Sequence, residues 1–145
     1  MSVTPEQVIE VMKKYVQAWG TGDKKLFLTL FAENVLWSDP VGTPEFKGLA
    51  GLEKFWDFAH QGAGRRLSPK VEEMRACANE GILRFVMQVR IPDKNQGLDL
   101  SIIDRFVLDD TGKIRSGGAY WDGSHASVPA GMQLFAPNIE DAYEK

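Results

Sequence analysis

The beginning of the chain has the apolar spacing of an amphipathic helix. Its apolar positions lie four, three and four residues apart, which puts them on one helix face. They are Val8, Met12, Tyr15 and Trp19. Thr4, Pro5 and Gln7 mark the start, because threonine caps a helix, proline is favoured at its first position and glutamine completes a capping box. The side chain of Tyr15 is therefore predicted to point into the core.

Two more helical patterns follow. Residues 20–22, Gly-Thr-Gly, end the first helix, and Asp23 can cap a second one. The apolar positions of this second helix are Leu26, Phe27, Leu30 and Phe31. A strand-like run at residues 35–38 ends in the turn signal Asp-Pro-Val-Gly at residues 39–42. Helical spacing then returns and stops at residues 62–64. The apolar positions of this third helix are Leu49, Leu52, Phe55, Trp56 and Ala59.

From Leu67 onward, apolar residues recur at every second position, as in strands with one buried face. The first such run is Leu83, Phe85, Met87, Val89 and Ile91. The second is Leu98, Leu100, Ile102, Phe106 and Leu108. A turn at residues 109–112 leads into a strand over residues 114–121. Helices followed by hairpin-linked strands predict one α+β domain over residues 1–145, in which three helices pack into the concave face of a long, curved antiparallel sheet.

Asp104 interrupts the second run, because counting by twos puts it on the apolar face between Ile102 and Phe106. An ionised carboxylate without a partner is costly there, so burial is expected to raise the pKa of Asp104 and keep the group neutral. A neutral carboxyl group can donate a hydrogen bond. A β-bulge at this point would instead turn the side chain to solvent and give it a structural role.

Composition and charge narrow the classes of function. The 145 residues carry a net charge of −3, with a pI near 5.4 and no basic stripe. These properties argue against nucleic-acid binding and against a membrane-surface anchor, and they favour a small neutral ligand. The N-terminus has no signal-peptide pattern, and no segment is apolar over the roughly 18 residues of a membrane span. We therefore expect a cytoplasmic protein.

Cysteine and histidine are too sparse for an internal disulfide or a metal site. Cys77 is the only cysteine, and His60 and His125 are the only histidines. The two histidines are far apart in sequence and belong to no known ligand pattern. No metal is therefore expected.

Three polar residues carry a resemblance to a known family. Taken alone, Tyr15 is an ordinary core tyrosine, and Asp39 before a proline is an ordinary turn residue. Tyr15 precedes Asp39 by 24 positions, however, and Asp104 precedes Trp121 by 17 positions. With both intervals ungapped, this pattern resembles the bacterial Δ5-3-ketosteroid isomerases of the NTF2-like (SnoaL-like) superfamily, over nearly the whole chain to about Trp121.

The resemblance implies an NTF2-like cone and a proton transfer that needs no cofactor. Asp39 matches the family's general base, which moves a proton from C4 to C6 of a 3-oxo-Δ5-steroid. Tyr15 and a protonated Asp104 match the two hydrogen-bond donors to the dienolate oxygen. The chemistry requires such a pairing, because a base must face the carbon while donors face the oxygen on which negative charge develops.

The resemblance also implies the protein's partners. One is an apolar, steroid-like ketone, and the residues expected to bind it are Trp19, Phe31, Phe55, Trp56, Phe85, Met87 and Trp121. The other is a second copy of the chain, because the family pairs through its outer sheet face into a homodimer. Ile103 and Val86 lie among polar residues on that face.

The chain departs from the family in two places. Phe31 and Trp56 stand where some members have tyrosines that support the oxyanion tyrosine, so Tyr15 is expected to act with less support. Residues 124–145 form a C-terminal extension that matches no part of the family. This extension contains the apolar residues Met132, Leu134 and Phe135, and it is expected to cover the cavity mouth or an interface.

Two other functions fit the same fold. NTF2-like domains also resemble polyketide cyclases, dehydratases and epoxide hydrolases, which place different polar groups in the same cone. His60 and His125 are poor candidates for the pocket histidines of a dehydratase, and Arg105 should point away from Asp104, which disfavours an Asp-Arg-Asp epoxide hydrolase site. The third hypothesis is a non-catalytic module that binds an apolar small molecule.

Overall fold

The computed structural model describes residues 2–62 and 64–136. Its first element is helix α1 (Pro5–Thr21). Thr4 caps α1 as predicted: its hydroxyl accepts a hydrogen bond from the Gln7 backbone N–H at 3.2 Å, and the Gln7 side-chain oxygen accepts one from the Thr4 N–H at 2.8 Å. Tyr15 is only 3% exposed, which confirms that its side chain points into the core.

Helices α2 (Lys24–Thr29) and α3 (Gly48–Ala59) complete the helical layer of the described chain. The prediction that α2 extends to Phe31 is wrong. The Leu30 carbonyl accepts a hydrogen bond from the Ile114 N–H at 2.9 Å, so the chain joins the sheet at this point. No helix within the described residues is long and apolar enough to cross a membrane.

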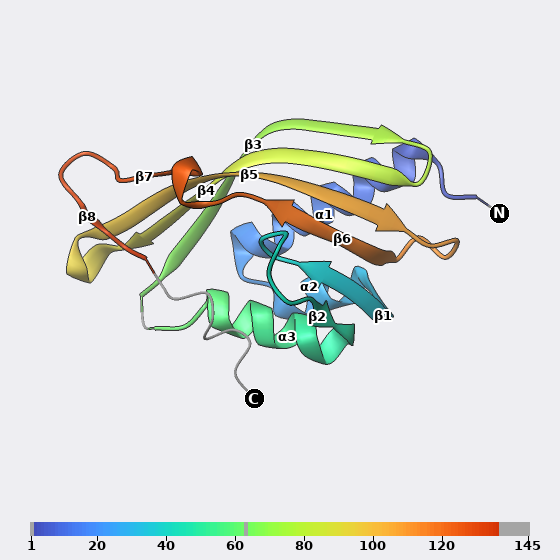
Figure 1. The fold of residues 1–145 in the computed structure, drawn as a ribbon, viewed down its shortest axis with the longest axis horizontal. Helices are drawn as coiled ribbons and strands as arrows, with labels where there is room; N and C mark the ends of the chain where they lie inside the picture. The colour runs from blue at the N-terminus through green and yellow to red at the C-terminus, as the bar shows by residue number, and fades with distance from the viewer. Residues whose placement is uncertain (1, 63, 137–145) are drawn as a thin grey trace.

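The described strands form one curved sheet of eight members (Figure 1). They are β1 (Phe31–Ser38), β2 (Phe46–Lys47), β3 (Arg66–Cys77), β4 (Glu80–Ile91), β5 (Gln96–Leu108), β6 (Ile114–Tyr120), β7 (Ala126–Ser127) and β8 (Gln133–Leu134). The order across the sheet is β2-β1-β6-β5-β4-β3, and β7 and β8 pair with β5. Helix α1 packs against β3 and β4, and α3 packs against β1 and β2. The predicted α+β cone is therefore confirmed.

The sheet is mixed and not wholly antiparallel, contrary to the prediction. Strands β3 to β6 follow one another along the chain and pair antiparallel, whereas β1 lies parallel to β6. Two neighbouring strands that are joined by a short hairpin must run antiparallel. No hairpin joins β1 to β6, because α3 and strands β3 to β5 lie between them in the sequence, so these two strands can pair in parallel. Ser38 pairs with Gly118, so both strands leave the sheet at the same edge.

Gly117 permits the close approach of β6 to its two neighbours in the sheet, β5 and β1. Its φ is +157°, and a Cβ atom at this position would lie 2.0 Å from the Arg105 carbonyl oxygen and 2.8 Å from the ring of Trp37. Any larger residue would push the strands apart. The glycine thus fixes the position of the Trp37 indole under the sheet.

After β6, the chain up to residue 136 folds back along β5. In β7, Ser127 pairs with Asp99, and in β8, Leu134 pairs with Gly97. Both contacts lie at the beginning of β5, which is the end opposite to Asp104. Residues 137–145 of the predicted extension lie outside the described residues.

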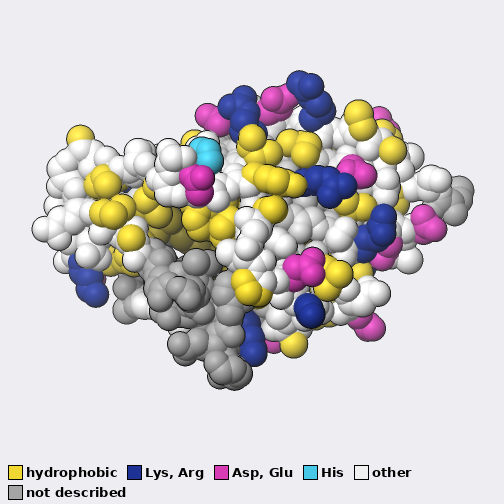
Figure 2. Space-filling model, viewed as in Figure 1, with side chains coloured by type: hydrophobic (Ala, Val, Ile, Leu, Met, Phe, Trp, Pro, Cys, Tyr) yellow, Lys and Arg dark blue, Asp and Glu magenta, His cyan; other side chains and the backbone are white. Residues whose placement is uncertain are grey.

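The outer face of the sheet exposes an apolar patch formed by Ile82, Ile103 and Tyr120, which we call the outer-face patch. These side chains are 40%, 39% and 48% exposed, and Ile103 pairs directly with Tyr120 across β5 and β6. Figure 2 shows hydrophobic side chains over this part of the sheet, bordered by charged ones. Val86 lies further along β4 and is partly buried.

We predict that the protein is a dimer in solution and that Ile103→Arg converts it into a monomer, because the substitution would bury two guanidinium groups in an apolar two-fold interface. Size-exclusion chromatography with light scattering measures the change. Val71→Arg is the matched control: Val71 is 45% exposed on β3 but pairs with the inward-facing Phe85, so this variant should remain dimeric. A wild-type protein that is monomeric at all micromolar concentrations would contradict the prediction.

Candidate functional site

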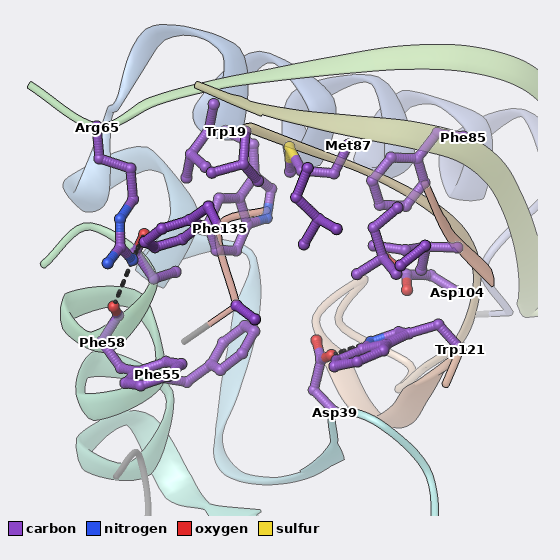
Figure 3. Close-up of a pocket in the computed structure, with 18 of the residues that line it drawn as sticks. Trp19, Asp39, Phe55, Phe58, Arg65, Phe85, Met87, Asp104, Trp121 and Phe135 are labelled. Atoms are coloured by element: carbon purple, nitrogen blue, oxygen red, sulfur yellow. Dashed lines mark hydrogen bonds between the residues drawn. The ribbon is translucent and has the colours of Figure 1, made fainter. Parts of the chain in front are cut away.

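An apolar cavity of about 360 Å³ lies between α1, α3 and the concave face of the sheet. This volume is within the range of small-molecule sites. Strands β4 and β5 supply its long wall, which consists of Phe85, Met87, Val89, Leu98, Leu100 and Ile102. Figure 2 shows hydrophobic side chains in a hollow beside β7 and the short helix η2 (Gly123–His125), and Figure 3 shows the interior.

Asp39 lies at one end of the cavity, directly after β1 (Figure 3). The Trp37 indole N–H donates a hydrogen bond to Oδ2 at 3.1 Å, and the Trp121 indole N–H donates one to Oδ1 at 2.9 Å. Trp121 comes directly after β6. Because β1 and β6 run parallel, the ends of both strands meet at one edge, and this places the Trp121 indole beside the Asp39 carboxylate.

Burial raises the pKa of Asp39 to about 6, although the hydrogen bonds from Trp121 and Trp37 act in the opposite direction. The side chain is 7% exposed. At neutral pH most molecules therefore have an ionised Asp39. A carboxylate with this pKa is a stronger base than an exposed one, and it can take up a proton near neutral pH.

Asp104 extends into the same end of the cavity as Asp39 (Figure 3). Strands β4 and β5 keep an unbroken register, which holds Asp104 opposite Leu83 on the inward face without a bulge. The side chain is 1% exposed, as the sequence alternation predicts. Neither carboxyl oxygen has a well-formed hydrogen bond to another described residue.

The protonation of Asp104 follows from these surroundings. Burial, followed by the charge of Asp39, raises the pKa of Asp104 well above its usual value, against a smaller opposing effect of the nearby Tyr15 hydroxyl. Burial and the charge of Asp39 thus both favour the neutral form of the group. A neutral carboxyl group has a proton that it can donate to a ligand oxygen.

The Tyr15 hydroxyl belongs to the same polar cluster. Its ring is fixed by aromatic neighbours, with centroids 4.9 Å from Phe106 and 6.3 Å from Trp37. Burial raises the pKa of Tyr15 well above its usual value, and the nearby carboxyl groups of Asp104 and Asp39 raise it further. The phenol remains neutral and can donate a hydrogen bond into the cavity, whose wall it helps to form.

The structure brings all three predicted catalytic candidates to the cavity, but only some of the predicted binding residues. The predicted binding residues in its lining are Trp19, Phe55, Phe85, Met87 and Trp121. Phe31 and Trp56 do not line the cavity, contrary to the prediction, and they lie in the core behind residues that do. Phe31 packs behind Tyr15 at 6.5 Å between ring centroids, and Trp56 packs behind Trp19 at 4.6 Å. Because Phe31 begins a strand and does not end a helix, its ring faces the core beneath α1.

The residues of the site that sequence reasoning missed include Trp37, which donates a hydrogen bond to Asp39, and Arg65, which lines the cavity. Trp37 and Asp39 are two positions apart, so the period of a strand would have placed the indole on the face of the carboxylate. Arg65 lies in a turn before β3, where no periodicity indicates its direction. The expected role of the extension is supported, because Leu134 and Phe135 line the cavity.

Arg105 points away from Asp104, as predicted. Its guanidinium group forms an ion pair with Glu80 at 2.8 Å on the outer face. His60 stacks on Trp56 with centroids 4.1 Å apart, and neither His60 nor His125 lines the cavity. Within residues 2–62 and 64–136, no group of three His, Cys, Asp or Glu side chains is placed to hold a metal ion.

Comparisons with known proteins agree with this geometry. Residues 12–117 match the SnoaL-like domain family. The chain is similar to the structure of RV0760c from Mycobacterium tuberculosis, with 18% identity and a TM-score of 0.75 over 87% of this chain and 98% of that chain. It is also similar to an M. tuberculosis LEH-like epoxide hydrolase, with 13% identity and a TM-score of 0.71 over 83% of this chain and 86% of that one.

A third similar structure is that of the epoxide hydrolase/cyclase-like enzyme SalBIII, which has a role in pyran ring formation in polyether salinomycin. The identity is 21% and the TM-score 0.72, over 85% of this chain and 96% of that chain. At such identities the three structures establish a shared fold. The reaction has to be inferred from the polar groups in the cavity.

We predict that Asp104→Leu stabilises the folded protein by roughly 1–3 kcal/mol at neutral pH, because it removes a buried polar group whose oxygens have no well-formed hydrogen bond to a described residue. The leucine has room, since the side chain faces the cavity. Urea denaturation measures the free energy of unfolding.

The pH dependence provides the control. Because the pKa of Asp104 is higher in the folded protein than in the unfolded chain, folding is accompanied by proton uptake at Asp104. The wild type therefore loses stability as the pH rises above about 3.9, the ordinary pKa of an aspartate. The gain from Asp104→Leu should therefore be larger at neutral pH than in acid. Asp104→Asn, which cannot ionise, should remove the same pH dependence. A leucine variant less stable than wild type at neutral pH would show that Asp104 has a stabilising partner.

Proposed function

Because this chain belongs to the SnoaL-like domain family, we propose that its cavity is the active site of a steroid Δ-isomerase, which moves a proton from C4 to C6 of a 3-oxo-Δ5-steroid. One observation carries the proposal: an ionised Asp39 and two neutral donors, Tyr15 and Asp104, extend into the same end of an apolar cavity. The pairing of a base with donors of this kind suits proton abstraction next to a ketone.

In the proposed reaction, Asp39 removes a proton from C4 and becomes a neutral carboxylic acid. The electron pair of the broken C–H bond moves towards the carbonyl, and the C3 oxygen becomes the negative end of a dienolate. Asp39 then returns the same proton to C6, which leaves the conjugated Δ4 ketone. The substrate gains and loses one proton, so no cofactor or second substrate is required.

The proposed role of Tyr15 and Asp104 is to hold the C3 oxygen. Both groups are buried, so their O–H dipoles act in a medium of low dielectric constant, where they stabilise a developing negative charge more strongly than in water. Burial is the largest cause of both raised pKa values, and it favours the neutral, hydrogen-donating form of each group. Each can therefore donate a proton to a hydrogen bond throughout the cycle.

Trp37 and Trp121 are proposed to position the base. Each donates one indole N–H to a different oxygen of Asp39, and this fixes the plane of the carboxylate. Their hydrogen bonds also favour the ionised form and limit the rise in the pKa of Asp39 that burial causes. Without them, a carboxyl group at this depth would bind its proton more tightly and would be a poorer acceptor at the start of the reaction.

A second candidate reaction is supported by the same pair of carboxyl groups. Asp39 is ionised and Asp104 is neutral, so one can accept a proton from a hydroxyl group while the other donates one to an epoxide oxygen. Such a pair would close an oxygen-containing ring in a hydroxy-epoxide, and the fold of SalBIII is similar. We favour the isomerase, because Tyr15 adds a second neutral donor where an oxyanion would form. The non-catalytic binding module is the third candidate.

The central prediction is that the protein converts 5-androstene-3,17-dione into its conjugated Δ4 isomer without an added cofactor. Asp39→Asn should reduce turnover by at least roughly 10²–10⁴-fold, because an amide cannot accept the C4 proton. Absorbance of the enone product follows the reaction. Asp99→Asn is a matched control, since Asp99 forms an ion pair with Arg90 and does not line the cavity.

Measurements of ligand binding distinguish the possible causes of a negative result in the isomerase assay. A phenolic steroid, which mimics the dienolate, should bind both the wild type and Asp39→Asn, because the two oxyanion donors remain. A wild-type protein that binds 3-oxo-Δ5-steroids but does not isomerise them would contradict the isomerase and favour the binding module. Ring closure of a hydroxy-epoxide by the same protein would favour the cyclase. Full activity of Asp39→Asn would show that another group is the base.

The pKa of Asp39 predicts the pH profile of the reaction. The ionised form is the base, so kcat/KM should be nearly constant above about pH 7 and fall about tenfold per pH unit below about 6. Stopped-flow or steady-state rates at subsaturating substrate report this value for the free enzyme. Circular dichroism over the same range controls for unfolding. An inflection near about 4, the value of an exposed aspartate, would show that Asp39 is not desolvated.

A further inference from the structure

The cavity has a cationic end opposite to the Asp39 and Asp104 end. Leu67, Val89 and Leu98 form one row across β3, β4 and β5, and all three line the cavity. Asp104 lies six residues beyond Leu98, which is about 20 Å along the strand. Arg65 lies two residues before Leu67 and also lines the cavity, so it is at the end remote from Asp104, as Figure 3 shows.

The Arg65 side chain is held in a fixed orientation. Its Nη1 donates hydrogen bonds to the carbonyl oxygens of Phe58 and Ala59, at 3.0 Å and 2.7 Å, at the end of α3. The centre of the guanidinium group lies 4.6 Å from the centre of the Phe135 ring. The group is thus clamped between a helix end and the C-terminal segment.

The charge of Arg65 is not matched by any described acidic side chain. No ion pair joins it to a residue within the ranges 2–62 and 64–136, and its Nε is buried without a hydrogen-bond partner. It is also the one Lys or Arg among the described lining residues. Burial lowers the pKa of Arg65, which is the direction expected for a cation that has lost water without gaining a counter-ion.

The chemistry of this end favours an anion. Nη1 is occupied by the two backbone carbonyls and Nε is buried, which leaves Nη2 as the guanidinium nitrogen that faces a ligand. A carboxylate oxygen at Nη2 would accept a charge-assisted hydrogen bond and bring a negative charge to the uncompensated cation. A neutral ketone could accept the hydrogen bond but would leave the charge uncompensated.

We propose that Arg65 binds a carboxylate at the far end of the substrate, so that the natural ligand is an elongated apolar ketone whose enolisable carbonyl and carboxylate groups lie at opposite ends. This inference rests on the proposed function for the orientation of the ligand, with the ketone at Tyr15 and Asp104. Arg65 is then the residue that selects acidic steroid-like ketones over neutral ones. It takes no part in the proton transfer.

A purely structural role for Arg65 makes a different prediction. If the side chain only caps α3 and supports Phe135, its removal would loosen the cavity wall and weaken all ligands alike. A carboxylate site, in contrast, distinguishes a charged ligand from a neutral ligand of the same shape. The difference between two matched ligands therefore separates the two roles.

The test compares 3-oxo-androst-4-ene-17β-carboxylate with its methyl ester by isothermal titration calorimetry. Both ligands already have the conjugated Δ4 ketone, so binding is measured without turnover. We expect the wild type to bind the acid at least about tenfold more tightly than the ester, as for a hydrogen-bonded charge pair that is partly buried. Arg65→Gln should lose this preference and keep its affinity for the ester. Arg66→Gln, which changes an exposed neighbour outside the cavity lining, should keep the preference.

The outcomes are distinct from those that test the isomerase. Equal affinity of the wild type for acid and ester, failure of either ligand to bind, or an equal loss of both affinities in Arg65→Gln would overturn the carboxylate site. A preference for the acid that depends on Arg65, in a protein that does not isomerise 3-oxo-Δ5-steroids, would support the carboxylate site and reject the proposed reaction. Arg65→Lys should retain part of the preference, because lysine keeps the charge but not the backbone hydrogen bonds that orient the Arg65 guanidinium group.

Discussion

The parallel pairing of β1 with β6 is the constraint on which the site depends. It brings the ends of two strands that are distant in sequence to one edge of the sheet, and the side chains that follow them, Asp39 and Trp121, come into hydrogen-bond contact. The pairing is close because Gly117 has no side chain to separate the strands. The Trp37 indole, packed against that glycine, then reaches the second carboxylate oxygen. A backbone arrangement thus determines the chemistry of a side chain.

Burial acts in the same direction on the pKa values of the two carboxyl groups in the cavity, but the hydrogen bonds that oppose it differ. Burial is the largest influence on both Asp39 and Asp104, and it favours the neutral form of each. Two indole donors offset part of this effect at Asp39, whereas at Asp104 only the nearby Tyr15 hydroxyl opposes it among the described residues. The proximity of the two groups adds to the difference, since one negative charge disfavours a second nearby. The same residue type therefore differs in its tendency to ionise at two positions of one cavity.

Local periodicity was sufficient to predict some of these features. The stripe of α1 places Tyr15 inside, and the alternation of β5 places Asp104 there, because each depends on the geometry of a single element. The direction of β1, the retreat of Phe31 behind Tyr15 and the course of the chain after β6 depend on contacts between distant segments. Arg65 lies in a turn, where the direction of a side chain is set by the carbonyl groups that it meets. Such features require the assembled fold.

The C-terminal segment contributes to the cavity wall but lies outside the residues that match the family. Tyr15, Asp39 and Asp104 all lie within the family match of residues 12–117, whereas Leu134 and Phe135, which also line the cavity, lie beyond it. Changes in the segment after Trp121 can therefore alter one part of the cavity wall while Tyr15, Asp39 and Asp104 stay as they are. Such a division is favourable for evolutionary divergence, because selection can change this part of the wall without changing those three groups. A family with this architecture can acquire new substrates from a short, replaceable stretch of sequence.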